Sequence, residues 1–119
     1  MPNKVYEYNG CSTCRKALKW LEQNEADYKS IPIRETPPSK AELRRMLKLY
    51  DGNIRKIFNT SGAEYKKLNL KDNLPKLTEA QLIDMLNTNG NLVKRPFLIN
   101  KEGGRVGFME QEWSDFFGL

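Results

Sequence analysis

The sequence contains no histidine. This excludes serine–histidine–aspartate and cysteine–histidine catalysis, imidazole-ligated zinc and an unperturbed imidazole as proton shuttle. Cysteine is scarce as well, with 2 among 119 residues, which is too few for a disulfide framework or a closed four-cysteine zinc site.

Long apolar runs are also missing. No run approaches the roughly 20 apolar residues that cross a bilayer, and "MPNKVYEYNG" lacks the apolar segment of a secretory signal. We therefore expect a cytoplasmic protein without membrane association. Thiols stay reduced in that compartment, so two neighbouring cysteines are more often reactive than structural.

Length and net charge further limit the class of protein. The 119 residues fit a single domain, 1–119, large enough to bury a core without disulfides or a metal. The net charge of +5 indicates an anionic substrate or partner. Basic residues alternate with acidic ones, as in "EYKKLNLKDN", and no nucleic-acid reader motif is present, so direct nucleic-acid binding is not expected.

The order of predicted elements indicates an α/β fold. "KVYEY" and "DYKSIPI" are typical of short strands on either side of a helix over 12–24. A helical block follows over about 39–90, with Ser39 and Thr78 as expected N-caps. "RPFLIN" and "RVGFM" then flank a turn, and "EQEWSDFFG" predicts a last helix. A βαβ unit, a helical insertion and a ββα unit predict a thioredoxin-like mixed four-stranded sheet.

Cys11 and Cys14 lie at the predicted start of the first helix. Cys11 falls at the N-cap, where unpaired N–H groups and the helix dipole stabilise a thiolate, and Arg15 would add positive charge. Cys14 follows one turn later, within disulfide range, so it can resolve an adduct on Cys11. Two alternatives stay open: the thiols are inert core residues, or they form half of a zinc site shared between subunits.

The segment "VKRPFLI" places a proline at the start of a predicted strand. In thioredoxin-like sheets the corresponding proline is cis and faces the active thiol, where the neighbouring backbone receives an extended or thiol substrate. We therefore predict a cis bond between Arg95 and Pro96, against a base rate of about 5–6% for such bonds. The alternative is a proline that is tolerated only because a strand can begin without its N–H donor.

Five segments together resemble the bacterial arsenate reductase-like family of the thioredoxin-like superfamily: "YNGCSTCRKALKWL", "PPSKAELRRML", "IRKIFNTSGAEYKKL", "NLVKRPFLI" and "GRVGFMEQEW". The family includes glutaredoxin-coupled arsenate reductases and Spx-type transcriptional regulators. The resemblance implies a catalytic role for Cys11, with Arg55 and Arg95 holding the arsenate oxyanion and lowering the thiol pKa. The guanidinium fork suits a tetrahedral oxyanion. The alternative for each arginine is a solvated surface position.

The resemblance leaves two functions open. Phe108 stands where the reductases place a further arginine after the last hairpin, so we expect weaker oxyanion binding. The Cys-x-x-Cys pair and the ending "VGFMEQEW" are more similar to the Spx-type branch. In that branch a disulfide between the two cysteines switches binding to the C-terminal domain of the RNA polymerase α subunit.

The leading hypothesis is a thiol oxidoreductase in which Cys11 attacks an oxyanion or an oxidised thiol and Cys14 resolves the adduct. No bound cofactor or metal is expected, and glutathione, glutaredoxin or thioredoxin would supply the electrons. The rival hypothesis is a redox-switched regulator that binds polymerase. The expected site residues are Cys11, Cys14 and Arg95 for catalysis, and Arg15, Arg55 and Pro96 for substrate binding.

Overall fold

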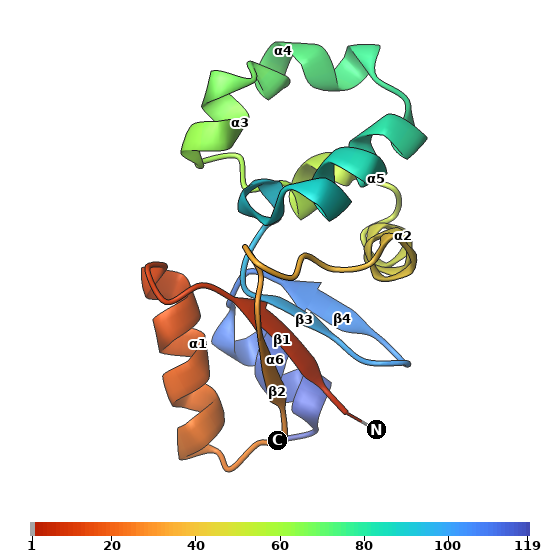
Figure 1. Cartoon of the computed structure of the whole chain (residues 1–119). Helices are drawn as coiled ribbons and strands as arrows, with labels where there is room; N and C mark the ends of the chain where they lie inside the picture. Colours follow the sequence, from red (N-terminus) through yellow and green to blue (C-terminus); the bar gives the residue numbers. More distant parts are fainter. Residues whose placement is uncertain (1) are drawn as a thin grey trace.

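The computed structural model describes residues 2–119 and contains one mixed sheet (Figure 1). The strand order is β2-β1-β3-β4, with β1 parallel to β2 and antiparallel to β3, and with β3 antiparallel to β4. The predicted fold class is therefore confirmed. The strands are β1 (Lys4–Glu7), β2 (Lys29–Pro32), β3 (Phe97–Ile99) and β4 (Gly104–Val106).

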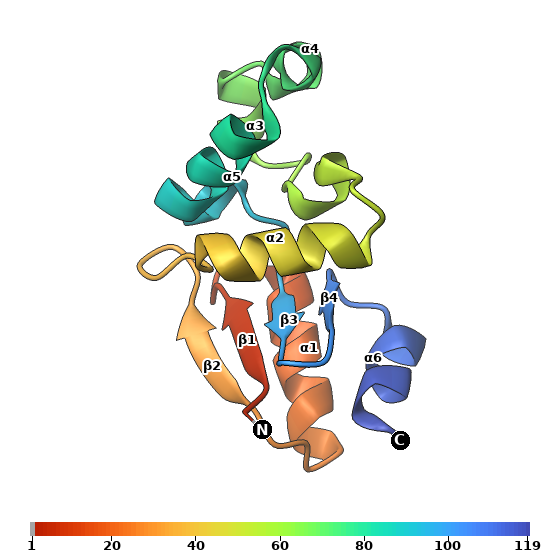
Figure 2. The same cartoon turned by 90° about the vertical axis from the view of Figure 1, so that its right-hand side faces the viewer.

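Helices account for most of the rest of the chain. Two of them, α1 (Ser12–Gln23) and α6 (Glu110–Phe117), cover one face of the sheet (Figures 1 and 2). The segments between β2 and β3, called the helical insertion below, lie across the other face and beyond one end of the strands. They are α2 (Lys40–Leu49), the 3₁₀ helix η1 (Ile54–Ile57), α3 (Ala63–Lys67), α4 (Leu70–Asn73), the 3₁₀ helix η2 (Leu74–Lys76), α5 (Glu79–Thr88) and the 3₁₀ helix η3 (Gly90–Leu92).

Strand alternation divides the core into two clusters. Val5 and Leu98 point toward α1 and α6, where they pack with Leu21 and the fully buried Trp113. The next residue along β1, Tyr6, points to the opposite face and packs with side chains of the insertion. Successive strand side chains point to opposite faces, so a short strand serves both clusters and holds the helical insertion and α1 in fixed positions.

The predicted N-caps of the two longest insertion helices are confirmed. Ser39 Oγ accepts from the N–H of Glu42 at 3.1 Å, and Glu42 Oε1 accepts from the N–H of Ser39 at 3.0 Å. Thr78 and Gln81 form the same reciprocal pair at α5. These capping boxes satisfy N–H groups that have no partner inside the helix, which is why each helix begins where the sequence indicates.

Glu42 also has a second role, because its carboxylate is buried between β1 and α2. The Tyr6 hydroxyl donates to Oε1 at 2.6 Å, and the Lys4 Nζ lies 3.1 Å from Oε2. Burial acts to raise the pKa of Glu42, but the hydrogen bonds from Tyr6, the Ser39 N–H and Lys4 outweigh it and hold the pKa below its usual value. The ionised form therefore stabilises the fold at neutral pH.

We expect Tyr6→Phe to lower the free energy of unfolding at pH 7 by about 1.5–3 kcal/mol, because a buried carboxylate loses a hydrogen-bond donor. Since the folded-state pKa of Glu42 is depressed, its stabilisation is present above the unfolded pKa of about 4.3 and is lost as the pH falls through the folded pKa. The difference between variant and wild type should therefore shrink in acid. Urea unfolding at pH 7 and at pH 3 measures both effects, with Tyr28→Phe as the control expected to stay near wild type.

Candidate active site

The first turn of α1 places Cys11 at its N-cap. The residue has extended backbone angles, with φ of −95° and ψ of 117°, and its Sγ accepts from the backbone N–H of Cys14 at 3.4 Å. This end of α1 lies at the end of the sheet that faces the helical insertion (Figures 1 and 2). The sulfur is half-buried and stands at the positive end of the helix dipole, as the sequence predicted.

The two thiols differ sharply in acidity. Partial burial acts to raise the pKa of Cys11, but hydrogen bonds from the Cys14 thiol and backbone N–H, together with the Arg95 guanidinium, lower it below its usual value. Cys14 is fully buried, and its burial and the neighbouring Cys11 sulfur raise its pKa to about 12. Both cysteines are free in this structure. The pair is therefore asymmetric, with the accessible sulfur being the better nucleophile.

Arg95 reaches this site from the start of β3. Its Nη1 is buried and has no hydrogen-bond partner among the described residues. Its guanidinium lies over the Tyr8 ring, 5.2 Å from the centroid, and the Arg34 guanidinium lies 4.6 Å from the same centroid. The Arg95–Pro96 peptide bond is cis, which confirms that prediction. An unpaired buried N–H group beside a sulfur suits an anionic ligand.

Two other predicted arginines lie elsewhere. Arg15 donates from Nη1 to the Asn9 carbonyl oxygen at 2.7 Å, so the charge that lowers the Cys11 pKa is that of Arg95 instead. Arg55 lies on η1 and lines a cavity that neither cysteine lines. The structure therefore brings Arg95 to the thiol, whereas substrate-binding roles for Arg15 and Arg55 remain predictions.

Phe108 occupies an aromatic cluster between α1 and α6. Its ring centroid lies 5.1 Å from that of Trp113 and 6.0 Å from that of Trp20. Both are edge-on or tilted contacts of the kind that stabilise packing. An arginine at this position could not make them, and the side chain supplies no charge for an oxyanion. The expectation of weaker oxyanion binding stays a prediction.

Sequence reasoning missed Tyr8 and Arg34. Tyr8 is close to Cys11 in the chain, and its backbone oxygen accepts from the Cys11 N–H at 3.0 Å, so its position carried a local signal. Arg34 had no such signal in the sequence, because only the pairing of β2 with β1 brings it over the Tyr8 ring. No group of three or more potential metal-ligating side chains occurs within residues 2–119, and no helix in that range is long and apolar enough to cross a membrane.

The mixed sheet, the thiol at the start of α1 and the cis-proline before β3 define a thioredoxin-like protein with a Cys-x-x-Cys pair. Residues 6–116 match the model of the ArsC family. The chain belongs to this family, which confirms the resemblance.

Three similar proteins cover nearly all of the chain. The uncharacterised Bacillus subtilis protein YusI is 41% identical over 92% of this chain and 93% of its own. The global transcriptional regulator Spx of Listeria innocua is 32% identical over 91% of this chain and 81% of its own. The crystal structure of a possible arsenate reductase from Streptococcus mutans is 36% identical and has a TM-score of 0.87, over 96% of this chain and 98% of that one. The relatives thus include both reductase-like and regulator proteins.

Proposed function

We propose that this protein is a cytoplasmic thiol oxidoreductase in which the Cys11 thiolate attacks an oxyanion or an oxidised thiol. The observation that carries the proposal is the combination of a Cys11 sulfur with a lowered pKa and the unpaired, buried Nη1 of Arg95 close to it. A buried donor without a partner costs about 1–3 kcal/mol. An anionic group bound next to Cys11 would remove that cost, so substrate binding and thiol activation would use the same guanidinium.

With a disulfide substrate, the Cys11 sulfur forms a bond to one substrate sulfur and the other leaves as a thiolate. Cys14 then loses its proton and attacks the Cys11 sulfur, which releases the second substrate thiolate and leaves a Cys11–Cys14 disulfide. With arsenate, Cys11 would form a sulfur–arsenic bond and displace one oxygen ligand, which takes up a proton from solvent and leaves as water. Attack by Cys14 would then break the sulfur–arsenic bond and leave its electron pair on arsenic as arsenite. Either substrate gains two electrons, and the two thiols lose them.

The Cys14 environment supports this order of events. Its pKa is high partly because it donates to the Cys11 sulfur and faces that sulfur's negative charge. When Cys11 becomes part of an adduct, its negative charge disappears and these two contributions disappear with it. The pKa of Cys14 then falls, so the resolving thiolate forms only after the first bond has been made. Glutathione, glutaredoxin or thioredoxin would return two electrons to the disulfide.

The test is the pH dependence of Cys11 alkylation by iodoacetamide, which follows the thiolate fraction. We expect a midpoint below the usual cysteine pKa of about 8.5 in the wild type. Arg95→Gln should raise the midpoint by about one unit, which lowers the alkylation rate at pH 6 about tenfold. Arg95→Lys should restore part of the loss, and Arg15→Gln should change the midpoint less than Arg95→Gln. A wild-type midpoint at or above 8.5 would show an unactivated thiol and contradict the proposal.

A second candidate function is a redox-switched regulator, because the relatives include proteins named Spx. The resemblance drawn from the sequence implies that such a protein binds the C-terminal domain of the RNA polymerase α subunit. Binding of the purified protein to that domain, measured in the oxidised and in the reduced state, distinguishes the two candidate functions. Binding that depends on the state of Cys11 and Cys14 supports the regulator, whereas turnover without binding supports the enzyme.

A further inference from the structure

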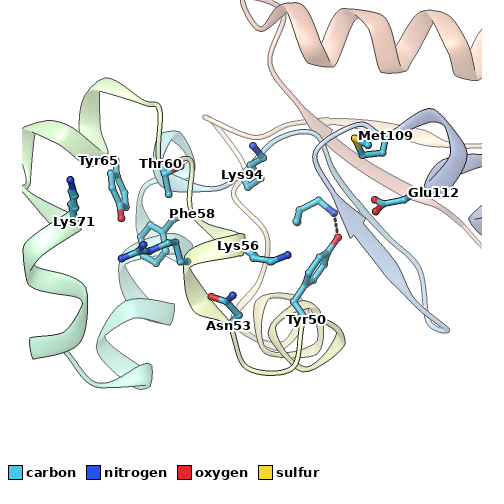
Figure 3. A pocket seen from close by; sticks show the side chains of 12 residues that line it. Tyr50, Asn53, Lys56, Phe58, Thr60, Tyr65, Lys71, Lys94, Met109 and Glu112 are labelled. Carbon is cyan, nitrogen blue, oxygen red and sulfur yellow. Dashed lines mark hydrogen bonds between the residues drawn. The ribbon is translucent and has the colours of Figure 1, made fainter.

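A cavity of about 590 Å³ lies between the helical insertion and the segment that joins β4 to α6 (Figure 3). Cys11, Cys14 and Arg95 are not among its lining residues, and Arg55 is the one predicted site residue that lines it. Its volume falls within the roughly 300–1,000 Å³ of small-molecule sites. Nothing in the thiol chemistry proposed above uses it.

The charge in this cavity is strongly one-sided. Arg55, Lys56, Lys71 and Lys94 line it, and Glu112 is its one acidic lining residue within the described part of the chain. None of the four cations makes a salt bridge or a side-chain hydrogen bond to another residue of 2–119. Lys94 is half-buried and the other three cations are exposed, so four positive charges without an acidic partner raise the potential at this one concave surface. The cavity therefore favours an anion.

The walls that carry these cations are held together before any ligand binds. The Lys94 N–H donates to the Ile57 carbonyl oxygen at 2.7 Å, and Phe58 pairs with Val93 in an isolated β-bridge. These contacts tie η1, which carries Arg55 and Lys56, to the segment that carries Lys94. On the far side, the Tyr50 hydroxyl accepts from the Val106 N–H at 3.0 Å, shown as the dashed line in Figure 3. Arg55, Lys56 and Lys94 therefore stand on segments that are joined before a ligand binds.

The lining also has an apolar part. Phe58, Tyr65 and Val106 line the cavity but are buried, so the apolar surface that is open to a ligand belongs mainly to Met109 and the half-buried Tyr50. Met109 is 62% exposed. A purely ionic ligand would leave this apolar surface exposed to water. A ligand with an apolar body would cover it and gain from the burial.

We propose that this cavity binds a small organic anion with two or more acidic groups on an apolar body, of the class of a nucleoside diphosphate. The acidic groups would contact Arg55 and the lysines, since the guanidinium fork and the ammonium groups are the usual partners of phosphate oxygens. The apolar body would lie against Met109 and the ring of Tyr50. The inference is independent of the proposed redox function, because no step of it involves a thiol.

Isothermal titration calorimetry of the reduced, full chain at physiological salt tests the proposal, with ADP, pyrophosphate and adenosine as probes. We expect ADP to bind more tightly than pyrophosphate, and adenosine not to bind measurably. The variant Lys56→Gln/Lys71→Gln should weaken ADP binding at least about tenfold. The matched control Lys19→Gln/Lys29→Gln removes the same charge from exposed positions outside the cavity and should bind like wild type.

Three results would overturn the proposal: no ADP binding at millimolar concentration, equal losses in the two double variants, or equal affinities for pyrophosphate and ADP. The absence of ADP binding would exclude the site. Equal losses would show that net charge, and not the cavity, controls binding. Equal affinities would show that the cavity does not contact the apolar body of the ligand. The Cys11 alkylation midpoint, measured on the same variants, should stay at the wild-type value. A failure of this inference is thereby distinguished from a failure of the proposed redox function.

Discussion

Cys11→Ser is expected to reduce thiol-dependent turnover to background, by about 10³-fold or more, whereas Cys14→Ser should leave the first bond-forming step intact. A serine hydroxyl is not ionised at neutral pH and cannot form a disulfide or a sulfur–arsenic bond, so no neighbouring group can replace the Cys11 sulfur. Cys14 is fully buried with a pKa raised to about 12, so it is not an alternative nucleophile in the folded protein.

The loss in Cys11→Ser is measured as turnover of arsenate and of a glutathione mixed disulfide. Glutathione, glutaredoxin and thioredoxin are tested separately as electron donors. Mass spectrometry measures the effect of Cys14→Ser, because this variant should accumulate a covalent substrate adduct on Cys11 when no external thiol is present. Ser12→Ala is the matched control, since it removes an exposed hydroxyl next to Cys11 and leaves both thiols in place. Turnover that persists in Cys11→Ser would rule out the proposed nucleophile.

Gly90→Ala is expected to lower the free energy of unfolding by about 3 kcal/mol or more, the upper part of the range for overpacking. A Cβ added at Gly90 would lie 1.8 Å from the Ile33 carbonyl oxygen and 2.7 Å from its carbon. These are backbone atoms and cannot rotate away as a side chain could. η3 would have to separate from the segment after β2, and that movement would open the packing around the buried Ile33 and Leu92.

Urea denaturation gives the loss directly, with Gly103→Ala as the control. At Gly103 the nearest heavy atom to an added Cβ is Phe116 Cε2 at 3.7 Å, which is ordinary contact, so we expect a change within about 0.5 kcal/mol. The Gly90 variant should also disturb the site, because the segment it displaces carries Arg34 over the Tyr8 ring. A Gly90→Ala protein as stable as wild type would show that this contact is loose.

Much of the fold could be predicted because its signals are local. A capping box joins residues three apart in the chain. Ser39 and Thr78 could therefore be predicted as the N-caps of two helices without any knowledge of the tertiary structure. The order of strands and helices limited the topology, since parallel strands need a crossover and antiparallel strands can share a short turn. The same reasoning placed Cys11 at the N-cap of α1, because capping depends on neighbours in the chain.

The charged partner of the thiol could be predicted only in part. Arg15 is close to Cys11 in sequence, yet its guanidinium turns back to the Asn9 carbonyl oxygen. Arg95 is far away in sequence and reaches the sulfur because β3 pairs with β1, with Phe97 opposite Tyr6. The family resemblance suggested Arg95, but charge near Cys11 in the sequence suggested Arg15 equally well.

Nothing in the sequence indicated that four cations would line one cavity, although the family resemblance had singled out Arg55 for a role beside the thiol. Arg55 and Lys56 belong to η1, Lys71 to α4 and Lys94 to the segment before β3, and each of the three lysines looks like an ordinary surface residue when taken alone. Folding of the insertion back onto the sheet brings them around one space. Such convergence depends on contacts between distant segments, which no short pattern records.

The sequence by itself determined which atom can act as a nucleophile. It has one Cys-x-x-Cys pair and no histidine, and the local hydrogen bonds of a helix start fix the sulfur of Cys11 at the positive end of a dipole. The tertiary structure decided which guanidinium lies close enough to lower the pKa of that sulfur and where the other cations gather. The physical reason is range: capping bonds act over one helical turn, whereas a charge acts through space on whatever the sheet register and the packing of the insertion bring near it.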